Sequence, residues 1–371
     1  MRIDIDATPL LLRSAGIKSY FYHWIRHLRA AAGGDAIRVF PFLGRFGPLI
    51  HEESMAGAWS TWPRLGLLYF LNVPGNPAMD LLVSGADLFH CSNQVRVPPR
   101  RVPLTATIHD MTCWLMPELH TPANVKADKN FAGTVLRKAV GLIAVSENTK
   151  RDAVRILDLD PSRVSVIYSG IPEAYFQVTT EGVRRVAELY QLDKPYVLHV
   201  GTIEPRKNLD ILLDAYAQLA PSLRQEVDLV IVGPVGWARP ETYRRLMSPA
   251  PGVRYLGYIP EEDLPSVTAG ATLLACLSFY EGFGFPVAQA MACGVPVVVS
   301  NVSSLPEVAG NAGLQADPRS AAAVRDAIDR LLSSPALRGE LSRLGRERAR
   351  RFRWEICARE SLEFFRQAAG R

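Results

Sequence analysis

Short apolar runs alternate with segments of helical spacing along the whole chain. The first half contains runs such as RIDIDA and GLIAVS, and the second contains YVLHVG, VDLVIVG and VPVVVS. Between such runs lie segments typical of helices, for example ENTKRDAVRIL and LDILLDAYAQL. Strands that are apolar on both faces and separated by helices form parallel sheets covered on both sides. The pattern therefore predicts an α/β fold with two doubly wound, Rossmann-like domains.

The chain has 371 residues, which is long enough for two domains of ordinary size. SGIPEAYF follows the last strand of the first half, and QLDKP precedes the first strand of the second. We expect an N-terminal domain over 1–172 and a C-terminal domain over 173–350. The tail, RERARRFRWEICARESLEFFRQ, has the spacing of one long amphipathic helix.

The sequence indicates the cellular compartment of the protein. The opening MRIDID alternates like a strand and lacks the apolar core of a signal peptide, and no window of about 18 apolar residues occurs. The cysteines are odd in number, scattered and without a CxxC pair, which predicts free thiols and neither a zinc site nor a disulfide framework. We therefore expect a cytoplasmic protein, soluble or peripheral to a membrane.

The positive charge is concentrated in the first half. Residues 1–172 carry 19 Lys and Arg against 14 Asp and Glu, whereas residues 173–371 carry 23 of each. This excess is compatible with contact between the N-terminal half and an anionic membrane, and equally with a mildly basic soluble surface. No motif for nucleic acids is present, so we expect no nucleic-acid partner.

Two loops at predicted strand ends carry candidate ligand-binding residues, because ligands of open parallel sheets bind at the carboxyl ends of strands. In HVGTIEPRKNLDILLDAY, Arg206 and Lys207 lie between a strand and a helix for which Asn208 is a candidate N-cap. Two cations beside a helix N-terminus suit a diphosphate. The alternative is a solvated loop with two surface charges.

The second loop is YEGFGFPVAQAMACG, which follows the apolar run TLLACLSF. Pro286 suits a first helical turn and Gly294 suits a C-cap, while Gly282 and Gly284 allow a ligand to approach the backbone. Glu281 would then lie at the strand end, where a carboxylate can accept hydrogen bonds from hydroxyls. Gln289, about two turns along the helix, can also bond hydroxyls but is uncharged.

These stretches together resemble the retaining, nucleotide-sugar-dependent glycosyltransferases of family 4, which have the GT-B fold. The resemblance is carried by VGTIEPRKN, SFYEGFGFPVAQAMACGVPVVVS and SSLPEVAGNAG, and less specifically by SAGIKSYFYHWIRHL, TIHD and VSENTKRDAV. It implies two Rossmann-like domains facing a central cleft, with the donor on the C-terminal domain and most of the acceptor site on the N-terminal domain. It also implies that the final helix, 351–371, packs back on the N-terminal domain.

The resemblance assigns roles in donor binding. Arg206 and Lys207 would hold the diphosphate and stabilise the leaving nucleotide, and Glu281 would contact the transferred sugar. Gln289 stands where the family usually has a second Glu that binds the ribose, so we expect the loss of this charge to weaken donor binding. The remaining implied donor contacts are Gly16, Gly201, Thr202, Gly282, Phe283, Gly284 and Phe285.

The N-terminal half contributes further candidates through the same resemblance. His109 matches a family histidine beside the transferred sugar, and a strand-end histidine bonded to the backbone is the alternative. Asp110 would either orient that ring or cap the turn. Lys18 replaces a glycine that the family often has there, so an acceptor contact is the expectation for Lys18 and for Asp110.

Two other patterns invite a different reading. The DxD triplets Asp4–Asp6 and Asp158–Asp160 formally match a metal motif of other glycosyltransferases, but neither has a glycine-rich phosphate loop nearby. Because the family is metal-independent, we expect no catalytic metal and no cofactor beyond the nucleotide sugar. The apolar run LGLLYFLNV is expected to be core or a wall of an acceptor groove.

The expected function is transfer of a hexose, mannose from GDP-mannose being favoured, with retained anomeric configuration. dTDP-rhamnose, UDP-glucose and UDP-GlcNAc are alternative donors. The acceptor would be a saccharide or lipid-linked saccharide in assembly of bacterial polysaccharide, including lipopolysaccharide. The alternatives are a nucleotide-sugar epimerase or a phosphorylase on the same fold, or a non-catalytic module that binds nucleotide sugars.

Overall fold

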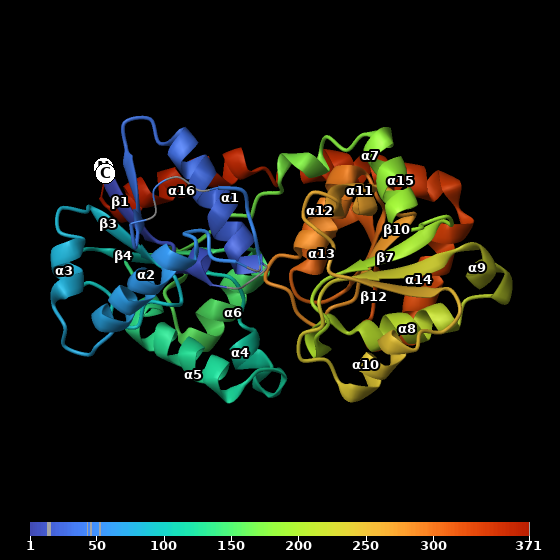
Figure 1. The fold of residues 1–371 in the computed structure, drawn as a ribbon, viewed down its shortest axis with the longest axis horizontal. Coiled ribbons are helices and arrows are strands. Elements are labelled where there is room, and N and C mark those ends of the chain that lie inside the picture. The colour runs from blue at the N-terminus through green and yellow to red at the C-terminus, as the bar shows by residue number, and fades with distance from the viewer. Residues whose placement is uncertain (13–15, 43, 45–46, 52, 371) are drawn as a thin grey trace. The chain divides into compact units, whose positions relative to one another are not determined.

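The computed structural model describes residues 1–12, 16–42, 44, 47–51 and 53–370. The chain divides into two compact units (Figure 1). The N-terminal unit comprises Met1–Gly170 and Trp354–Arg371, and the C-terminal unit comprises Ile171–Arg353. The last segment of the chain thus belongs to the N-terminal unit.

The N-terminal unit is built on a six-stranded parallel sheet of order β2-β1-β3-β4-β5-β6. The inner strands β3, β4 and β5 are buried along their whole length, as expected for apolar runs covered on both faces. The strands are β1 Arg2–Asp6, β2 Ala36–Phe40, β3 Leu88–Cys91, β4 Leu104–Ile108, β5 Gly141–Ala144 and β6 Val164–Val166.

Helices cover this sheet. Ser146 caps α6 by accepting a hydrogen bond from the Thr149 amide, as its position before ENTKRDAVRIL requires. The helix α16 packs on α1, where Trp24 Nε1 donates to Ser361 Oγ at 3.0 Å. The helices are α1 Gly16–Ala31, α2 Ala58–Leu71, α3 Ala78–Leu82, α4 Thr112–Leu115, α5 Pro122–Phe131, α6 Glu147–Leu157 and α16 Trp354–Ala368.

The C-terminal unit repeats the architecture with a six-stranded parallel sheet of order β12-β11-β10-β7-β8-β9. The strands β7 and β10, which precede the two candidate loops, are neighbours in this sheet. Because they run in parallel, their carboxyl ends meet at one edge. The strands are β7 Tyr196–Val200, β8 Asp228–Val232, β9 Val253–Gly257, β10 Leu273–Cys276, β11 Val297–Ser300 and β12 Gly313–Ala316.

An apolar core fills the space between this sheet and its helices, with Leu212, Leu229, Ile231 and Ile328 all buried in one cluster. The helices are α7 Thr180–Leu189, α8 Leu209–Ala217, α9 Pro221–Glu226, α10 Pro240–Met247, α11 Leu264–Ala269, α12 Phe285–Cys293, α13 Leu305–Ala309, α14 Ala321–Ser333 and α15 Pro335–Ala349. The described residues include no helix long and apolar enough to cross a membrane.

The expectation of one long tail helix is wrong. The helix α15 ends at Ala349, and α16 begins at Trp354. Between them Phe352 is buried against Phe283 of the C-terminal unit, with ring centroids 5.2 Å apart. Trp354 packs instead against Tyr20 of the N-terminal unit. Phe352 and Trp354, on either side of the break, thus enter the cores of two different units.

The expected core role of LGLLYFLNV holds for only part of it. Leu68 and Leu71 on α2 are buried, but Tyr69 is 82 % exposed and Phe70 is 56 % exposed. Although the run is apolar throughout, its helix has one buried face and one exposed face.

Candidate active site

The loop after β7 brings two cations to the sheet edge. Pro205–Lys207 forms a 3₁₀ turn, and the Lys207 side chain lies against Gly201. A Cβ on Gly201 would meet Lys207 Cε at 3.4 Å, and its φ of 154° lies where other residues are strained. A glycine is therefore needed at this strand end.

Asn208 occupies the N-cap position of α8 but does not cap it with its side chain. Its backbone is left-handed, with φ of 56°. Its side-chain Nδ2 donates to the carbonyls of Leu277 at 3.1 Å and Pro318 at 2.7 Å. The expectation of a conventional N-cap is thus wrong. The side chain instead ties the loop after β7 to the end of β10.

The loop after β10 is held by two serines that the sequence reasoning missed as site residues. Ser303 Oγ accepts from the Glu281 amide at 2.9 Å, and Ser304 Oγ donates to the carbonyls of Glu281 and Phe283 at 2.8 and 2.9 Å. Gly284 has φ of 100°, and a Cβ there would meet a Leu305 methyl at 2.7 Å. The two serines are the first residues of the quoted motif SSLPEVAGNAG, which was the available signal.

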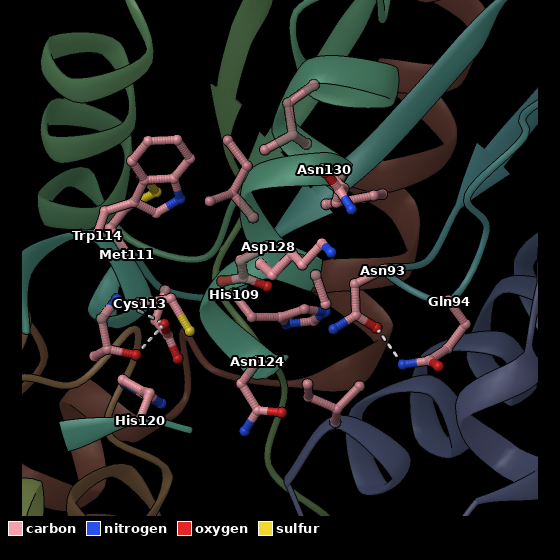
Figure 2. A pocket seen from close by; sticks show the side chains of 18 of the residues that line it. Asn93, Gln94, His109, Met111, Cys113, Trp114, His120, Asn124, Asp128 and Asn130 are labelled. Atoms are coloured by element: carbon pink, nitrogen blue, oxygen red, sulfur yellow. Dashed lines mark hydrogen bonds between the residues drawn. The ribbon is translucent and has the colours of Figure 1, made fainter. Parts of the chain in front are cut away.

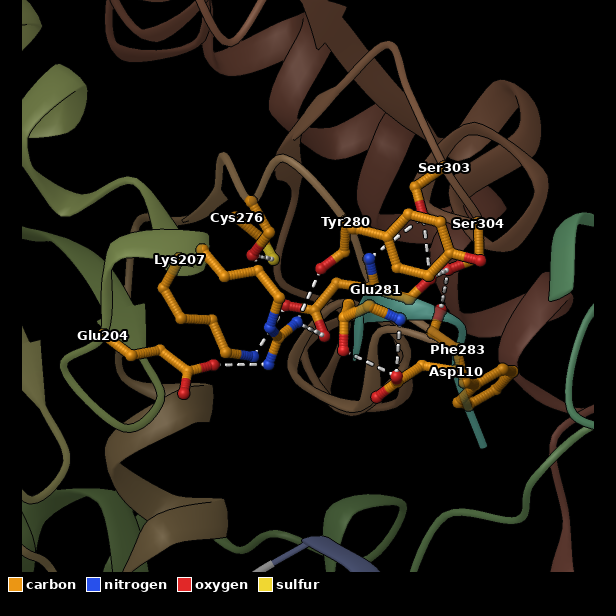
Figure 3. A network of polar contacts seen from close by, with 12 residues as sticks. Asp110, Glu204, Lys207, Cys276, Tyr280, Glu281, Phe283, Ser303 and Ser304 are labelled. Atoms are coloured by element: carbon orange, nitrogen blue, oxygen red, sulfur yellow. Dashed lines mark hydrogen bonds and ion pairs between the residues drawn. The ribbon is translucent and has the colours of Figure 1, made fainter. Parts of the chain in front are cut away.

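Glu281 joins the two loops in an ion cluster (Figure 3). Its Oε1 lies 2.6 Å from Lys207 Nζ, and its Oε2 lies 3.1 Å from Arg206 Nη1. Arg206 also contacts Glu204 Oε1 at 2.5 Å and donates to the Tyr280 carbonyl at 2.5 Å. The structure therefore brings together three of the four predicted catalytic residues. Glu204, two residues before Arg206 in the quoted motif, was not predicted.

The cluster keeps Glu281 ionised. Burial by itself would raise the pKa of Glu281, but the charges of Lys207 and Arg206 outweigh it. The hydrogen bonds from Lys207 and from Ser278 Oγ, the latter at 2.6 Å, act in the same direction, and the pKa falls to about 2. The carboxylate can thus accept hydrogen bonds at any physiological pH.

A histidine lies buried next to this cluster. Burial, and secondarily the charge of Lys207, lowers the pKa of His199 to about 4, so the ring is neutral beside the cations. Its Nδ1 lies 3.3 Å from the Ala275 carbonyl. His199 was not among the predicted site residues because it reads as an ordinary member of the apolar run YVLHVG.

Several other predicted donor residues belong to the same two loops or to the helix that follows them. Thr202 follows Gly201 in the same loop, and Phe283, Gly284 and Phe285 lead into α12. Gln289 is half-buried on α12. Since a helix N-terminus carries partial positive charge, this end of α12 adds to the attraction that Arg206 and Lys207 exert on an anion.

The N-terminal unit contains a cavity of about 690 Å³ (Figure 2). Its lining is rich in amide and carboxyl side chains and includes the predicted residues His109 and Asp110. Other polar side chains that line it are Asn93, Gln94, Arg96, Asn124, Lys126, Asp128 and Asn130.

His109 follows β4 and packs edge-on against Tyr20, with ring centroids 4.7 Å apart. Burial lowers the pKa of His109 to about 4, and the Asp110 charge offsets only part of this effect. Asp110 caps the following turn, since its Oδ1 accepts from the Thr112 amide at 2.9 Å and from the Thr112 hydroxyl at 2.6 Å. Asp110 was expected either to orient the His109 ring or to cap the turn, and these hydrogen bonds show that it caps the turn.

The structure places Gly16 and Lys18 at the start of α1. Lys18 is fully buried, and its Nζ donates to the carbonyls of His51 and Glu53. This ammonium links α1 to the backbone at His51 and at Glu53, and the acceptor contact of Lys18 stays a prediction.

The DxD carboxylates are used in local structure. Asp6 accepts hydrogen bonds from the amides and hydroxyls of Thr8 and Ser92, and Asp4 pairs with Arg2 and Arg38. Asp160 accepts from the Ser162 amide at 2.9 Å. Within the described ranges no group of three or more His, Cys, Asp or Glu could hold a metal ion. The five cysteines are free thiols.

Comparison with known proteins gives two family matches. Residues 15–175 match the model described as Glycosyltransferase Family 4, and residues 184–348 match Glycosyl transferases group 1. The chain is 30% identical over 381 residues to O-antigen chain mannosyltransferase B of Escherichia coli, covering 99% of this chain and 100% of that protein. It is 32% identical over 284 residues to D-inositol 3-phosphate glycosyltransferase of a Nocardioides species, covering 68% of this chain and 62% of that protein.

A solved structure has the same fold. HepE of Anabaena, in complex with UDP and glucose, superposes with a TM-score of 0.72 at 19% identity, covering 99% of this chain and 100% of that one. The two family models together match residues of both Rossmann-like units, and the E. coli relative aligns along its full length. The chain therefore belongs to the family 4 and group 1 glycosyltransferases, with the GT-B fold.

Proposed function

We propose that this glycosyltransferase moves a hexose from a nucleotide sugar to a saccharide with retention of anomeric configuration. The observation that carries the proposal is the cluster of Arg206 and Lys207 around the ionised carboxylate of Glu281. Two cations just before the start of α8 suit a diphosphate, and a carboxylate in contact with both suits sugar hydroxyls.

In the proposed reaction the bond between the sugar's anomeric carbon and the diphosphate oxygen breaks. Arg206 and Lys207 stabilise the negative charge that develops on the leaving nucleotide. The acceptor hydroxyl oxygen bonds to the anomeric carbon on the same face, and its proton passes to the leaving phosphate. The two cations supply the charge stabilisation, so the proposal includes no metal and no cofactor. His109 remains a predicted contact of the transferred sugar.

We propose mannose from GDP-mannose as the first donor to test. The support is the name of the E. coli relative, a mannosyltransferase aligned over its whole length. The HepE structure holds UDP and glucose, so uridine nucleotides belong in the same panel. Gln289 is the proposed ribose contact, through its carbonyl oxygen.

The acceptor is proposed to bind in the cavity of the N-terminal unit. Its amides, Asn93, Gln94, Asn124 and Asn130, each donate and accept hydrogen bonds, as sugar hydroxyls do. Asp128 adds a carboxyl group whose pKa burial raises. This lining suits a saccharide, free or lipid-linked, as in assembly of O-antigen and related polysaccharides. We accordingly propose a cytoplasmic protein that contacts the inner membrane from its cytoplasmic face.

A thermal-shift panel of nucleotides and nucleotide sugars tests the donor site, since a ligand that binds only the folded state raises the unfolding midpoint. We expect a guanosine or uridine diphosphate sugar to raise it in the wild type and not in Arg206→Ala/Lys207→Ala. Arg330→Ala, an exposed arginine on α14, is the matched control.

Product analysis with the donor so identified then separates the alternatives. Transfer to a saccharide with retained configuration supports the proposal. Turnover of donor without acceptor would show an epimerase, a requirement for free phosphate would show a phosphorylase, and binding without turnover would show a non-catalytic module. An inverted product by NMR would overturn the proposed mechanism.

A further inference from the structure

The helix α2 presents an aromatic face to solvent. Trp59 is 96 % exposed, Trp62 is 75 %, Tyr69 is 82 % and Phe70 is 56 %. These positions are separated by three, seven and one residues, so at 3.6 residues per turn they lie along one stripe of the helix. We call these four residues the α2 stripe.

The opposite face of α2 is buried in the core. Thr61, Leu68 and Leu71 are buried, which fixes which face of the helix turns inward. The stripe therefore cannot turn inward without exposing these residues. Four large aromatic side chains held on one outward face exceed the scattered apolar exposure of ordinary surfaces and indicate an interaction site.

The stripe carries no charge of its own. The helix AWSTWPRLGLLYFL contains no acidic residue, and its one basic residue, Arg64, donates to the carbonyls of Ser60 and Pro41 at 2.6 and 3.2 Å. The side chains that project outward from α2 are thus almost entirely aromatic or aliphatic.

Three exposed arginines lie beside α2 and the neighbouring α3. The Arg96 amide donates to Asn72 Oδ1 at the end of α2, at 2.7 Å. The Arg100 and Arg101 amides both donate to Asp80 Oδ1 on α3, at 2.6 and 3.2 Å. None of these three guanidinium groups forms an ion pair with another residue in the part of the chain that is described.

An aromatic stripe with a cationic border matches the interface of an anionic bilayer. Tryptophan and tyrosine favour the headgroup level, where the ring is partly in hydrocarbon and the polar atom in water. Nearby arginines gain from the negative surface potential of anionic lipids. A helix of this kind lies in the interface plane and does not span the membrane.

We propose that the α2 stripe, together with Arg96, Arg100 and Arg101, docks this enzyme on an anionic phospholipid surface. The biological role of this docking rests on the proposed function, because the enzyme would meet a lipid-linked acceptor at a membrane. The docking surface itself is argued from α2 and its border, so its test needs no activity.

The test is co-sedimentation of the full chain with vesicles of phosphatidylcholine alone or mixed in equal parts with phosphatidylglycerol. We expect the wild type to bind the mixed vesicles and to lose most of this binding at high salt. Arg96→Gln/Arg100→Gln/Arg101→Gln should weaken partition into mixed vesicles by on the order of a hundredfold. Trp59→Ser/Trp62→Ser should weaken partition by about tenfold or more.

Tyr243→Ser/Tyr258→Ser is the matched control, because both side chains are about half-exposed aromatics of the C-terminal unit. Equal vesicle binding by the control, the stripe variant and the wild type would overturn the proposal, as would failure of the wild type to bind. A wild-type dimer that Trp59→Ser/Trp62→Ser converts to monomer, without vesicle binding, would assign the stripe to a second copy instead.

The thermal-shift response to the donor separates this inference from the proposed function. The stripe variant should keep that response, which also shows that it is folded. If the wild type binds vesicles but no nucleotide sugar shifts its midpoint, the docking surface stands and the proposed donor site fails.

Discussion

The ammonium of Lys207 lies 2.6 Å from the Glu281 carboxylate, although 74 residues separate them in sequence. Arg206 contacts the same carboxylate, so the groups assigned to the diphosphate and to the sugar are partners of one another. A bound diphosphate would share the cations with Glu281 and leave its oxygens more available to sugar hydroxyls. The pairing thus holds both kinds of binding group in position.

Lys207→Gln should reduce sugar transfer far more than it reduces folding. Removing the cation takes away stabilisation of the leaving diphosphate, and loss of one such charged donor costs roughly 10²–10³ in kcat. Steady-state transfer measures the change, with Lys194→Gln, half-exposed at the start of the C-terminal domain, as control. Transfer at the wild-type rate would exclude Lys207 from catalysis.

Glu204→Gln tests whether Glu204 positions Arg206. Arg206 would lose a charged partner at 2.5 Å but keep Glu281 and the Tyr280 carbonyl. Since a hydrogen bond to a charged group is worth about 1.5–3 kcal/mol, we expect donor KM to rise roughly tenfold with a smaller fall in kcat. The exposed Glu226→Gln should change neither. A fall in kcat at constant KM would contradict the positioning role.

Gln289→Glu should strengthen donor binding if Gln289 contacts the ribose. A carboxylate accepts stronger hydrogen bonds from hydroxyls than an amide carbonyl does, by about 1–2 kcal/mol, so Kd should fall roughly five- to thirtyfold. Calorimetric titration of the donor found by the thermal-shift panel measures this. An unchanged Kd would place the ribose away from residue 289.

Glu281 should make folding stability depend on acid pH. Its folded pKa of about 2 lies below the ordinary value of 4.5, so its stabilising effect is complete above 4.5 and is lost as pH falls toward 2. Urea denaturation of wild type and Glu281→Gln should differ most near neutral pH, and the difference should shrink below pH 4.5. A difference that does not vary with pH would refute this linkage.

His109→Asn should lower transfer while leaving the nucleotide-induced thermal shift intact, because the predicted diphosphate contacts lie in the C-terminal unit. The folded pKa of His109, about 4, lies below 6.5, so its ring stays neutral down to about pH 5. Protonation in the unfolded chain then lowers stability as pH falls from 6.5 toward 4. An NMR titration of this ring with a midpoint near 6.5 would show that the ring is not buried as described.

The sequence by itself determined the architecture and predicted the residues of the candidate donor site. Apolar runs without alternation predicted two parallel sheets, because a strand buried on both faces needs no polar side. Glu281 and the pair Arg206 and Lys207 were predicted from loops at strand ends, where parallel sheets bind ligands. These are local patterns, and each can be read within one strand, loop and helix.

Only the tertiary structure decided which side chains meet. The contacts of Glu204 with Arg206, of Ser303 with Glu281, and of the buried Lys18 with distant carbonyls depend on how loops fold over one another. The exposure of Tyr69 is likewise set by which face of α2 the core takes. The apolar composition of a segment indicates that it can be buried. Which face of the segment is buried depends on packing, and packing involves residues far apart in the chain.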